Sequence, residues 1–146
     1  DISGGLLLQS RDAVSMDLSE ARVVTERKPS ADEWRALQLS WTVCKHVKSN
    51  AIVFCSPEKA IGVGAGQMSR IDAVEIAVKR ARFELQGTAV GSDAFFPFRD
   101  TVDALAKAGA TAVVQPGGSI RDEEVIQAAN ELGLAMVFTG KRHFRH

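Results

Sequence analysis

Two hydrophobic periodicities alternate along the chain, and together they predict alternating strands and helices. Short apolar runs of strand length occur in seven segments, at 4–10, 23–25, 51–56, 60–65, 88–93, 110–114 and 134–138. Between them, apolar residues recur at helical spacing in four segments, after Ser30, after Ser69, and over 100–108 and 121–132. This order is typical of an α/β fold. The runs within 51–65 form a predicted hairpin, so we expect a three-layer α/β/α fold whose mixed sheet is largely parallel in its second half.

Capping signals mark the starts of the first two helices. Ser30 precedes Glu33 by three residues, which is a capping-box signature, and Ser69 stands in the same relation to Asp72. The first helix is expected to bury one face, made of Trp34, Leu37, Trp41 and Cys44. The second helix is expected to share one face among Ile71, Val74, Val78, Ala81 and Leu85.

Composition narrows the class of protein. The 146 residues have the length of one domain, and 18 basic residues balance 18 acidic ones. Because a nucleic-acid binder needs a basic excess, we expect no nucleic-acid partner. No apolar run approaches the roughly 18 residues of a transmembrane helix, so we expect no membrane partner. Cys44 and Cys55 lack a CxxC spacing, which favours a reduced, cytoplasmic chain.

Two glycine-rich segments follow predicted strands. GVGAGQMSR, at 62–70, leads into a helix start, where glycines allow close approach of a ligand and the helix end favours an anion. It is neither a dinucleotide fingerprint nor a Walker motif. A tight turn explains it equally well, and Gln67 and Arg70 favour a binding site. In QPGGSIRDEE, at 115–124, a turn with Ser119 or Asp122 as helix cap is the simpler interpretation.

The segment SDAFFPFRD, at 92–100, places three Phe around Pro97. It leaves a strand at the edge where the two glycine-rich turns also lie, and open α/β sheets bind ligands at that edge. We expect Phe96 to be buried, and Phe95 and Phe98 to line a cleft shared with Arg70, Asn50 and Ser119. The alternative is that all three rings simply fill the core.

The histidines give no metal motif. His46 is expected near a helix end, and His143 and His146 lie in the terminal KRHFRH, which we expect to dock through Phe144. A His-x-x-His pair lacks a third ligand here, and no HxE or PCxxC motif is present, so we expect no zinc.

Six blocks in order resemble one known family. They are ISGGLLLQ, WTVCKHVKSNAIVF, IGVGAGQMSRIDAVEIA, SDAFFPFRDTVD, QPGGSIRDEEVI and the terminal RHFRH. Together they are similar to the C-terminal part of the bifunctional purine-biosynthesis enzymes that join aminoimidazole-carboxamide ribonucleotide (AICAR) transformylase to inosine monophosphate (IMP) cyclohydrolase. The resemblance covers nearly the whole chain and is weakest at 11–30.

The resemblance implies formyl transfer from 10-formyltetrahydrofolate, the co-substrate, to AICAR in IMP biosynthesis. Residues 1–146 would be the second of two cytidine-deaminase-like transformylase subdomains, with the first subdomain and the cyclohydrolase domain absent. The missing initial Met also favours a fragment. The family's catalytic Lys–His pair would lie upstream, so Lys45–His46 receives no catalytic role and the fragment alone is expected to be inactive.

The resemblance also assigns site residues and partners. The implied AICAR contacts are Asn50, Arg70, Phe95 and Arg142. The implied folate contacts are Ile71, Pro97, Phe98, Asp100, Ser119 and Ile120. A potassium ion is expected near Ser49 and Asp93, mostly through carbonyl oxygens. The implied macromolecular partners are a second copy, in a homodimer, and the upstream part of the same enzyme.

Two other classes stay open from the residues themselves. One is a non-catalytic module that binds a nucleotide or another anion, which the glycine-rich turns would allow. The other is a dimerisation domain. A binding module would take AICAR or folate unaided, whereas a dimerisation domain would bind neither and associate tightly.

Overall fold

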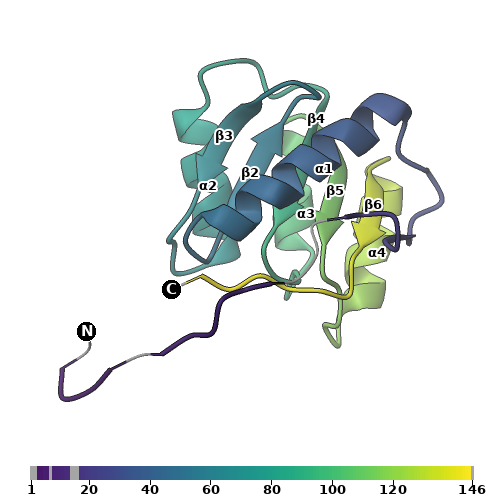
Figure 1. The fold of residues 1–146 in the computed structure, drawn as a ribbon. Coiled ribbons are helices and arrows are strands. Elements are labelled where there is room, and N and C mark those ends of the chain that lie inside the picture. Colours follow the sequence, from purple (N-terminus) through teal and green to yellow (C-terminus); the bar gives the residue numbers. More distant parts are fainter. Residues whose placement is uncertain (1–2, 7, 14–16, 146) are drawn as a thin grey trace.

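The computed structural model describes residues 3–6, 8–13 and 17–145. Within these ranges, helices and strands alternate along the chain from β1 to β6 (Figure 1). Their bounds are β1 (Arg22–Val23), α1 (Ala31–His46), β2 (Ile52–Cys55), β3 (Ala60–Gly64), α2 (Arg70–Arg80), β4 (Thr88–Ser92), α3 (Asp100–Lys107), β5 (Ala110–Gln115), α4 (Asp122–Glu131) and β6 (Ala135–Phe138). Each predicted helix is present, and so is each predicted strand except the first.

The strands form one mixed sheet in the order β1-β6-β5-β4-β2-β3. β4, β5 and β6 are parallel, whereas β1 is antiparallel to β6, and β2 is antiparallel to β3 and β4. Ile52, at the start of β2, pairs with Ser92 at the end of β4 and with Gly64 at the end of β3. The start of β2 therefore lies at the same edge as the ends of the other four long strands. This arrangement confirms the predicted hairpin and parallel second half.

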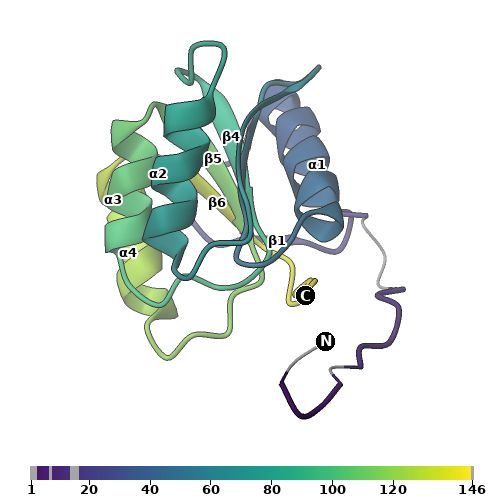
Figure 2. The same cartoon turned by 90° about the vertical axis from the view of Figure 1, so that its left-hand side faces the viewer.

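Helices cover both faces of the sheet, as a three-layer α/β/α fold requires (Figure 2). α1 lies on one face, where Leu37 and Trp41 pack against Val53 and Val114. α2, α3 and α4 cover the other face over a second core that includes Phe96. The fold class is confirmed, and the likeness to cytidine deaminases stays a prediction. None of the helices in the described ranges is long and apolar enough to cross a bilayer.

Both predicted helix caps are present. Ser30 accepts from the Glu33 backbone N–H at 3.2 Å, and the Glu33 carboxylate accepts from the Ser30 N–H at 2.8 Å, so the capping box is complete. Ser69 accepts from the Asp72 N–H at 3.1 Å. α2 is shorter than predicted, because it ends at Arg80, and the expected face residue Leu85 packs against the core from the following loop.

The glycines of β3 serve helix packing. A Cβ added at Gly64 would lie 1.8 Å from the Ala73 carbonyl oxygen, and one at Gly62 would lie 2.6 Å from that of Ala77. Only glycine lets α2 approach β3 so closely. Packing therefore explains part of the GVGAG pattern. Gln67 and Arg70 remain the candidate binding residues of this segment.

The predicted buried strand at 4–10 is wrong. The described residues of this segment form no strand, and Leu6 and Leu8 are 63% and 82% exposed, whereas Leu7 lies outside the described residues. Figure 1 shows the segment leaving the body of the fold. An apolar run becomes a buried strand only beside a partner strand, and no strand of the described chain pairs with it here.

Candidate functional site

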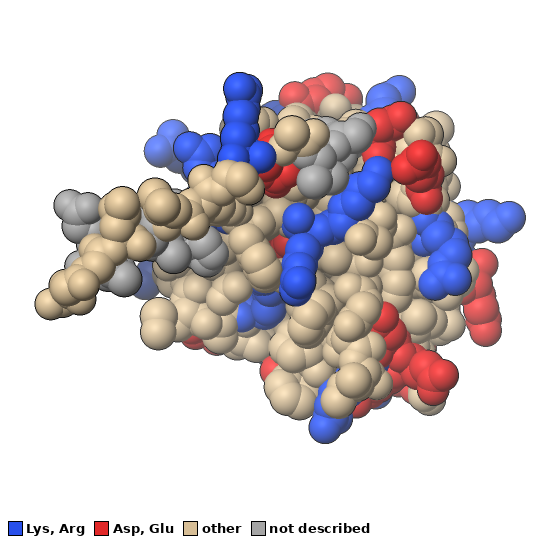
Figure 3. Space-filling view, turned by 60° about the horizontal axis from the view of Figure 1, so that its bottom comes forward, with Lys and Arg blue, Asp and Glu red and all other residues tan. Residues whose placement is uncertain are grey.

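The predicted site segments meet at one edge of the sheet. They are the start of β2, the loop between β3 and α2, the loop between β4 and α3, the loop between β5 and α4, and the tail after β6. Figure 3 looks toward this edge and shows Lys and Arg side chains spread over it, with acidic side chains mainly at its periphery. The structure therefore confirms that the unusual strand-exit loops share an edge, which is where open α/β sheets bind ligands.

Asp93 is the buried centre of this edge. Its side chain is fully buried, and Oδ1 accepts from the Ala51 N–H at 3.0 Å and from Nη1 of Arg70. The same Nη1 lies 3.3 Å from the Ala51 carbonyl oxygen, and Arg70 is only 8% exposed. The Asp93 carbonyl accepts from the His143 N–H at 3.1 Å. One residue thus joins the start of β2, the start of α2 and the tail.

Asn50 is fixed against the loop that precedes α2. Its Nδ2 donates to the carbonyls of Gln67 at 3.0 Å and Met68 at 3.1 Å, and the backbones of Asn50 and Gln67 bond each other in both directions. The Asn50 Oδ1 forms no hydrogen bond within the described residues. A fixed amide with an available acceptor can orient a polar ligand group without adding charge.

The C-terminal tail is docked, as expected, but its anchor differs from the prediction. Phe144 is 37% exposed, whereas His143 is 1% exposed. The His143 ring stands edge-on to Trp41, with centroids 4.7 Å apart. Arg142 is exposed, and its guanidinium lies 5.3 Å from the Phe144 ring centroid. The predicted phosphate ligand therefore projects outward from a firmly held segment.

The three rings of the Phe segment differ in burial, and Phe96 is the buried one, as predicted. Phe96 is fully buried, Phe95 is partly buried and Phe98 is 49% exposed. The Phe96 N–H donates to Oε1 of Gln115 at 3.2 Å, and Gln115 is itself fully buried. The hypothesis that all three rings fill the core is therefore wrong, since Phe98 presents half of its surface.

The loop between β5 and α4 lies beside Phe98. The Gly117 N–H also donates to Oε1 of Gln115, so this one buried amide joins the two loops. The guanidinium of Arg121 lies 4.9 Å from the Phe98 ring centroid. Ile120 is fully exposed.

The predicted caps of α4 are partly right. The helix begins at Asp122, and its N-cap position is Arg121, which makes no side-chain cap. Instead, Oγ of Ser119 accepts from the Arg121 N–H at 3.1 Å. The Asp122 carboxylate accepts from the N–H groups of Gly118 at 2.7 Å and Ser119 at 3.1 Å. These bonds fix the loop that carries Ser119 and Ile120.

The remaining predicted folate contacts lie at the starts of α3 and α2 and within the Phe segment. Asp100 is exposed at the start of α3, where its Oδ1 accepts from the Thr101 N–H at 2.6 Å. Pro97 and Ile71 are partly buried, the latter in the first turn of α2. The exposed Asp100 carboxylate follows the half-exposed Phe98 ring by two residues, and such a combination suits a flat heteroaromatic ring.

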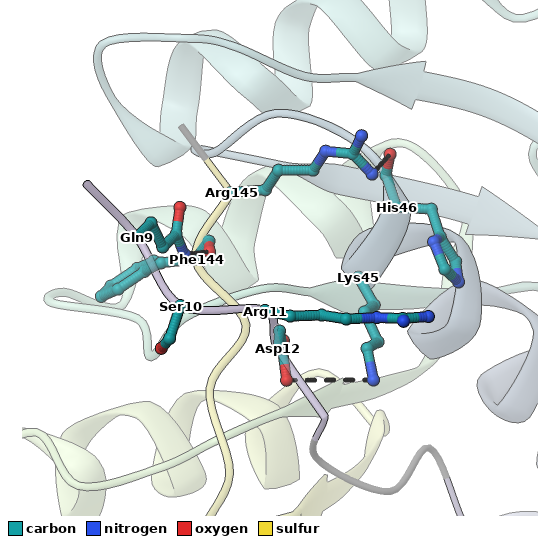
Figure 4. Close-up of a pocket in the computed structure, with 8 residues that line it drawn as sticks. All are labelled: Gln9, Ser10, Arg11, Asp12, Lys45, His46, Phe144 and Arg145. Carbon is teal, nitrogen blue, oxygen red and sulfur yellow. Dashed lines mark hydrogen bonds and ion pairs between the residues drawn. The ribbon is translucent and has the colours of Figure 1, made fainter. Parts of the chain in front are cut away.

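A hollow of about 600 Å³ lies under the tail and not beside the Phe segment (Figure 4). It is lined by Gln9, Ser10, Arg11, Asp12, Lys45, His46, Phe144 and Arg145. Two further hollows lie beside α1 and beside its start, and none of the three contains Phe95 or Phe98. These three hollows therefore do not include the predicted cleft beside the two rings.

A potassium ion near Ser49 and Asp93 stays a prediction. Oδ2 of Asp93 is buried without a hydrogen-bond partner among the described residues, so it offers one oxygen of the kind that hard cations prefer. Ser49 is tied to the tail, because its N–H donates to the Arg145 carbonyl at 2.9 Å and its Oγ accepts from the Arg145 N–H at 3.1 Å. These oxygens fit a potassium ion only in part.

Sequence reasoning missed three polar contacts that hold this edge together. They are the hydrogen bonds of the Gln115 amide to Phe96 and Gly117, the ion pair of Asp93 with Arg70, and the contact of His143 with Asp12. Gln115 ends β5 and Asp93 directly follows β4, and this position was the available signal for these two residues. Their partners are far away in the sequence, so no local pattern could name them.

The fold and the candidate site together define an α/β domain with a polar, partly basic edge at its strand ends. The chain belongs to the family whose model is described as AICARFT/IMPCHase bienzyme, which matches residues 1–80. Alignments that cover 99% of this chain show it to be similar to bifunctional purine biosynthesis proteins PurH. The identity is 59% with that of Magnetococcus marinus, 57% with that of Anoxybacillus flavithermus and 55% with that of Shouchella clausii.

The chain spans only 28–29% of the length of these curated relatives. The similarity confirms the predicted family and supports a role in purine biosynthesis.

Proposed function

We propose that this chain is the second transformylase subdomain of a bifunctional purine-biosynthesis enzyme and contributes substrate-binding residues to formyl transfer from 10-formyltetrahydrofolate to AICAR. One observation carries the proposal. Asn50, Arg70 and Arg142 lie at the sheet edge that also presents Phe98 and Ser119, although these residues come from five different segments.

The side chains of the AICAR half suit a charged nucleotide. Arg142 offers an exposed, fixed positive charge with forked donors for the phosphate. Asn50 offers an uncharged acceptor for the carboxamide or the amine. Arg70 is largely buried, so only the outer edge of its guanidinium is available to the nucleotide. Phe95 would border the imidazole ring.

The folate half presents apolar and acceptor groups. Phe98 and Ile120 offer exposed apolar surface to a flat pterin, and Pro97 stiffens the loop between the rings. Asp100 can accept hydrogen bonds from the pterin amino and ring N–H groups. Ser119 and Ile71 complete this side. In this arrangement the loop at 92–100 would separate the two substrates.

In the proposed reaction, the 5-amino nitrogen of AICAR attacks the formyl carbon of 10-formyltetrahydrofolate. A carbon–nitrogen bond forms to AICAR, and the bond from the formyl carbon to N10 of the folate breaks. The amine loses one proton and N10 gains one, which gives formyl-AICAR and tetrahydrofolate. The proton transfer is assigned to the upstream Lys–His pair that the family resemblance implies, so this chain would bind and orient. A second copy, in a homodimer, would complete the site.

The test compares two variants in a full-length protein of this family that carries this chain. Arg142→Ala should weaken AICAR binding, and Asp100→Ala should weaken folate binding, each about tenfold or more, because a charge-assisted hydrogen bond contributes on the order of 1.5–3 kcal/mol. The affinity of each variant for the other substrate serves as the internal control. The AICAR nucleoside without its phosphate should be nearly indifferent to Arg142→Ala. Equal losses for nucleotide and nucleoside would rule out the phosphate contact.

A further inference from the structure

We propose that His143 is a positioning residue that fixes the direction of Arg142 and thereby organises the phosphate side of the nucleotide site. The inference rests on the proposed function, since it takes Arg142 as the residue that holds the phosphate. It adds His143 and its partner Asp12, which neither the family resemblance nor the sequence pattern assigned to the site.

His143 is enclosed on two sides. Its Nδ1 lies 2.5 Å from Oδ2 of Asp12, and its ring packs edge-on against Trp41. The side chain is 1% exposed. A ring held by a carboxylate and an aromatic edge cannot turn without losing both contacts, so the backbone of the tail is fixed at this point.

Asp12 is itself held in place. Its Oδ1 lies 3.8 Å from Nζ of Lys45, in the last turn of α1, and Figure 4 shows the two side chains facing each other under the tail. Nε2 of Gln9 donates to the Phe144 carbonyl from the same N-terminal segment. The tail is therefore clamped between α1 and a segment more than a hundred residues away in the chain.

The burial of His143 sets the direction of its neighbour. The His143 N–H donates to the Asp93 carbonyl at 3.1 Å, which places the tail backbone beside the buried centre of the site. Successive side chains of an extended segment point to opposite sides, so a buried His143 turns Arg142 and Phe144 outward. Both are exposed, and the Phe144 ring beside the Arg142 guanidinium restrains it further.

A direct role of His143 in the chemistry does not agree with this geometry. Its Nε2 is buried and has no hydrogen-bond partner among the described residues. A group enclosed in this way reaches neither substrate at the sheet edge. His143 therefore acts on the nucleotide through Arg142.

The experiment uses a full-length protein of this family that carries this chain, and measures the AICAR Kd together with KM and kcat for formyl transfer. His143→Ala should weaken AICAR binding about three- to tenfold. The KM for 10-formyltetrahydrofolate and kcat should change less than about twofold, since catalytic groups are untouched. His143→Asn keeps an N–H close to the position of Nδ1 and should recover most of the affinity.

A double variant separates positioning from general destabilisation. Added to Arg142→Ala, His143→Ala should weaken AICAR binding by less than about a further twofold, because two residues that act as a unit are not additive. Val125→Ala removes buried volume on α4, on the opposite face of the sheet, and should leave the AICAR Kd unchanged. If His143→Ala does not fold, Asp12→Asn should show the same selective loss.

Three outcomes decide the matter. The positioning role is overturned if a folded His143→Ala binds AICAR normally. It is also overturned if His143→Ala weakens AICAR binding as much in the Arg142→Ala background as in the parent. Either result leaves the function of Arg142 intact. Unchanged AICAR binding by Arg142→Ala overturns both that function and this inference. The inference is supported if His143→Ala selectively weakens AICAR binding, His143→Asn restores it, and His143→Ala causes little further loss in the Arg142→Ala background.

Discussion

The guanidinium of Arg70 and the carboxylate of Asp93 form an ion pair that is buried at the edge of the sheet. Asp93 is fully buried and Arg70 is 8% exposed, so each charge depends on the other. The pair joins the start of α2 to the end of β4. A residue expected to contact the nucleotide is thus also a structural support for the loops around it.

Removing one partner of this pair should destabilise the fold strongly. Asp93→Ala leaves Arg70 buried and unpaired, and loss of one partner of a buried pair commonly costs about 3–5 kcal/mol. Urea unfolding followed by circular dichroism measures the change. Asp32→Ala, which breaks an exposed pair with Arg35, is the matched control and should cost at most about 1 kcal/mol. Equal small losses for the two variants would contradict the structural role.

This chain alone should lack transformylase activity. The resemblance places the proton-transferring pair upstream, and loss of a general acid or base commonly lowers the rate about 10²–10⁴-fold. Tetrahydrofolate release, assayed with both substrates, measures it against a full-length relative as the positive control. Turnover comparable to that relative would mean that Lys45 or His46 takes part in the chemistry.

The two neighbouring Phe residues should respond oppositely to truncation. Phe96→Ala empties a fully buried site and should lower the free energy of unfolding by about 3–5 kcal/mol. Phe98→Ala removes a half-exposed ring, so it should cost much less stability and instead raise the KM for 10-formyltetrahydrofolate. Each variant is the control for the other, with thermal unfolding and steady-state kinetics measured on the full-length protein. A large stability loss in Phe98→Ala with normal kinetics would make that ring a core residue.

Glu33 should contribute to acid unfolding. Burial raises the pKa of its carboxyl, but hydrogen bonds from Arg27, the Ser30 backbone and Thr111 outweigh burial and bring the pKa from 4.5 to about 2. Because the folded-state pKa is depressed, the stabilisation is present above the unfolded pKa, near 4.5, and is lost as pH falls toward 2.

A pH series of urea unfolding tests this assignment. Between pH 4.5 and 2, the parent chain should lose more stability than Glu33→Gln, which cannot titrate at this position. Asp32→Asn removes the exposed carboxylate of the preceding residue and is the control for the loss of one negative charge from the first turn of α1. If the stability of the parent and of Glu33→Gln fell in parallel over this pH range, the pKa of Glu33 would not be lowered in the folded state.

Local patterns in the sequence predicted every helix and every strand of the described sheet, together with the segments of the candidate site. Helix periodicity and the capping residues Ser30 and Ser69 are local properties, so they placed α1 and α2 before any tertiary contact was known. Turn glycines and Pro97 similarly marked the strand-exit loops. The topology rule for open sheets then placed those loops at one edge, and the structure agrees.

The buried polar groups that hold that edge together could be recognised only in the folded chain. Arg70 meets Asp93 across 23 residues and His143 meets Asp12 across 131, and such pairs leave no periodic trace in the sequence. The segment at 4–10 also shows that a local pattern does not determine pairing, because its apolar run predicted a strand that finds no partner in the described chain. Periodicity reports the conformation that a segment favours locally, whereas burial and pairing depend on what the rest of the chain brings beside it.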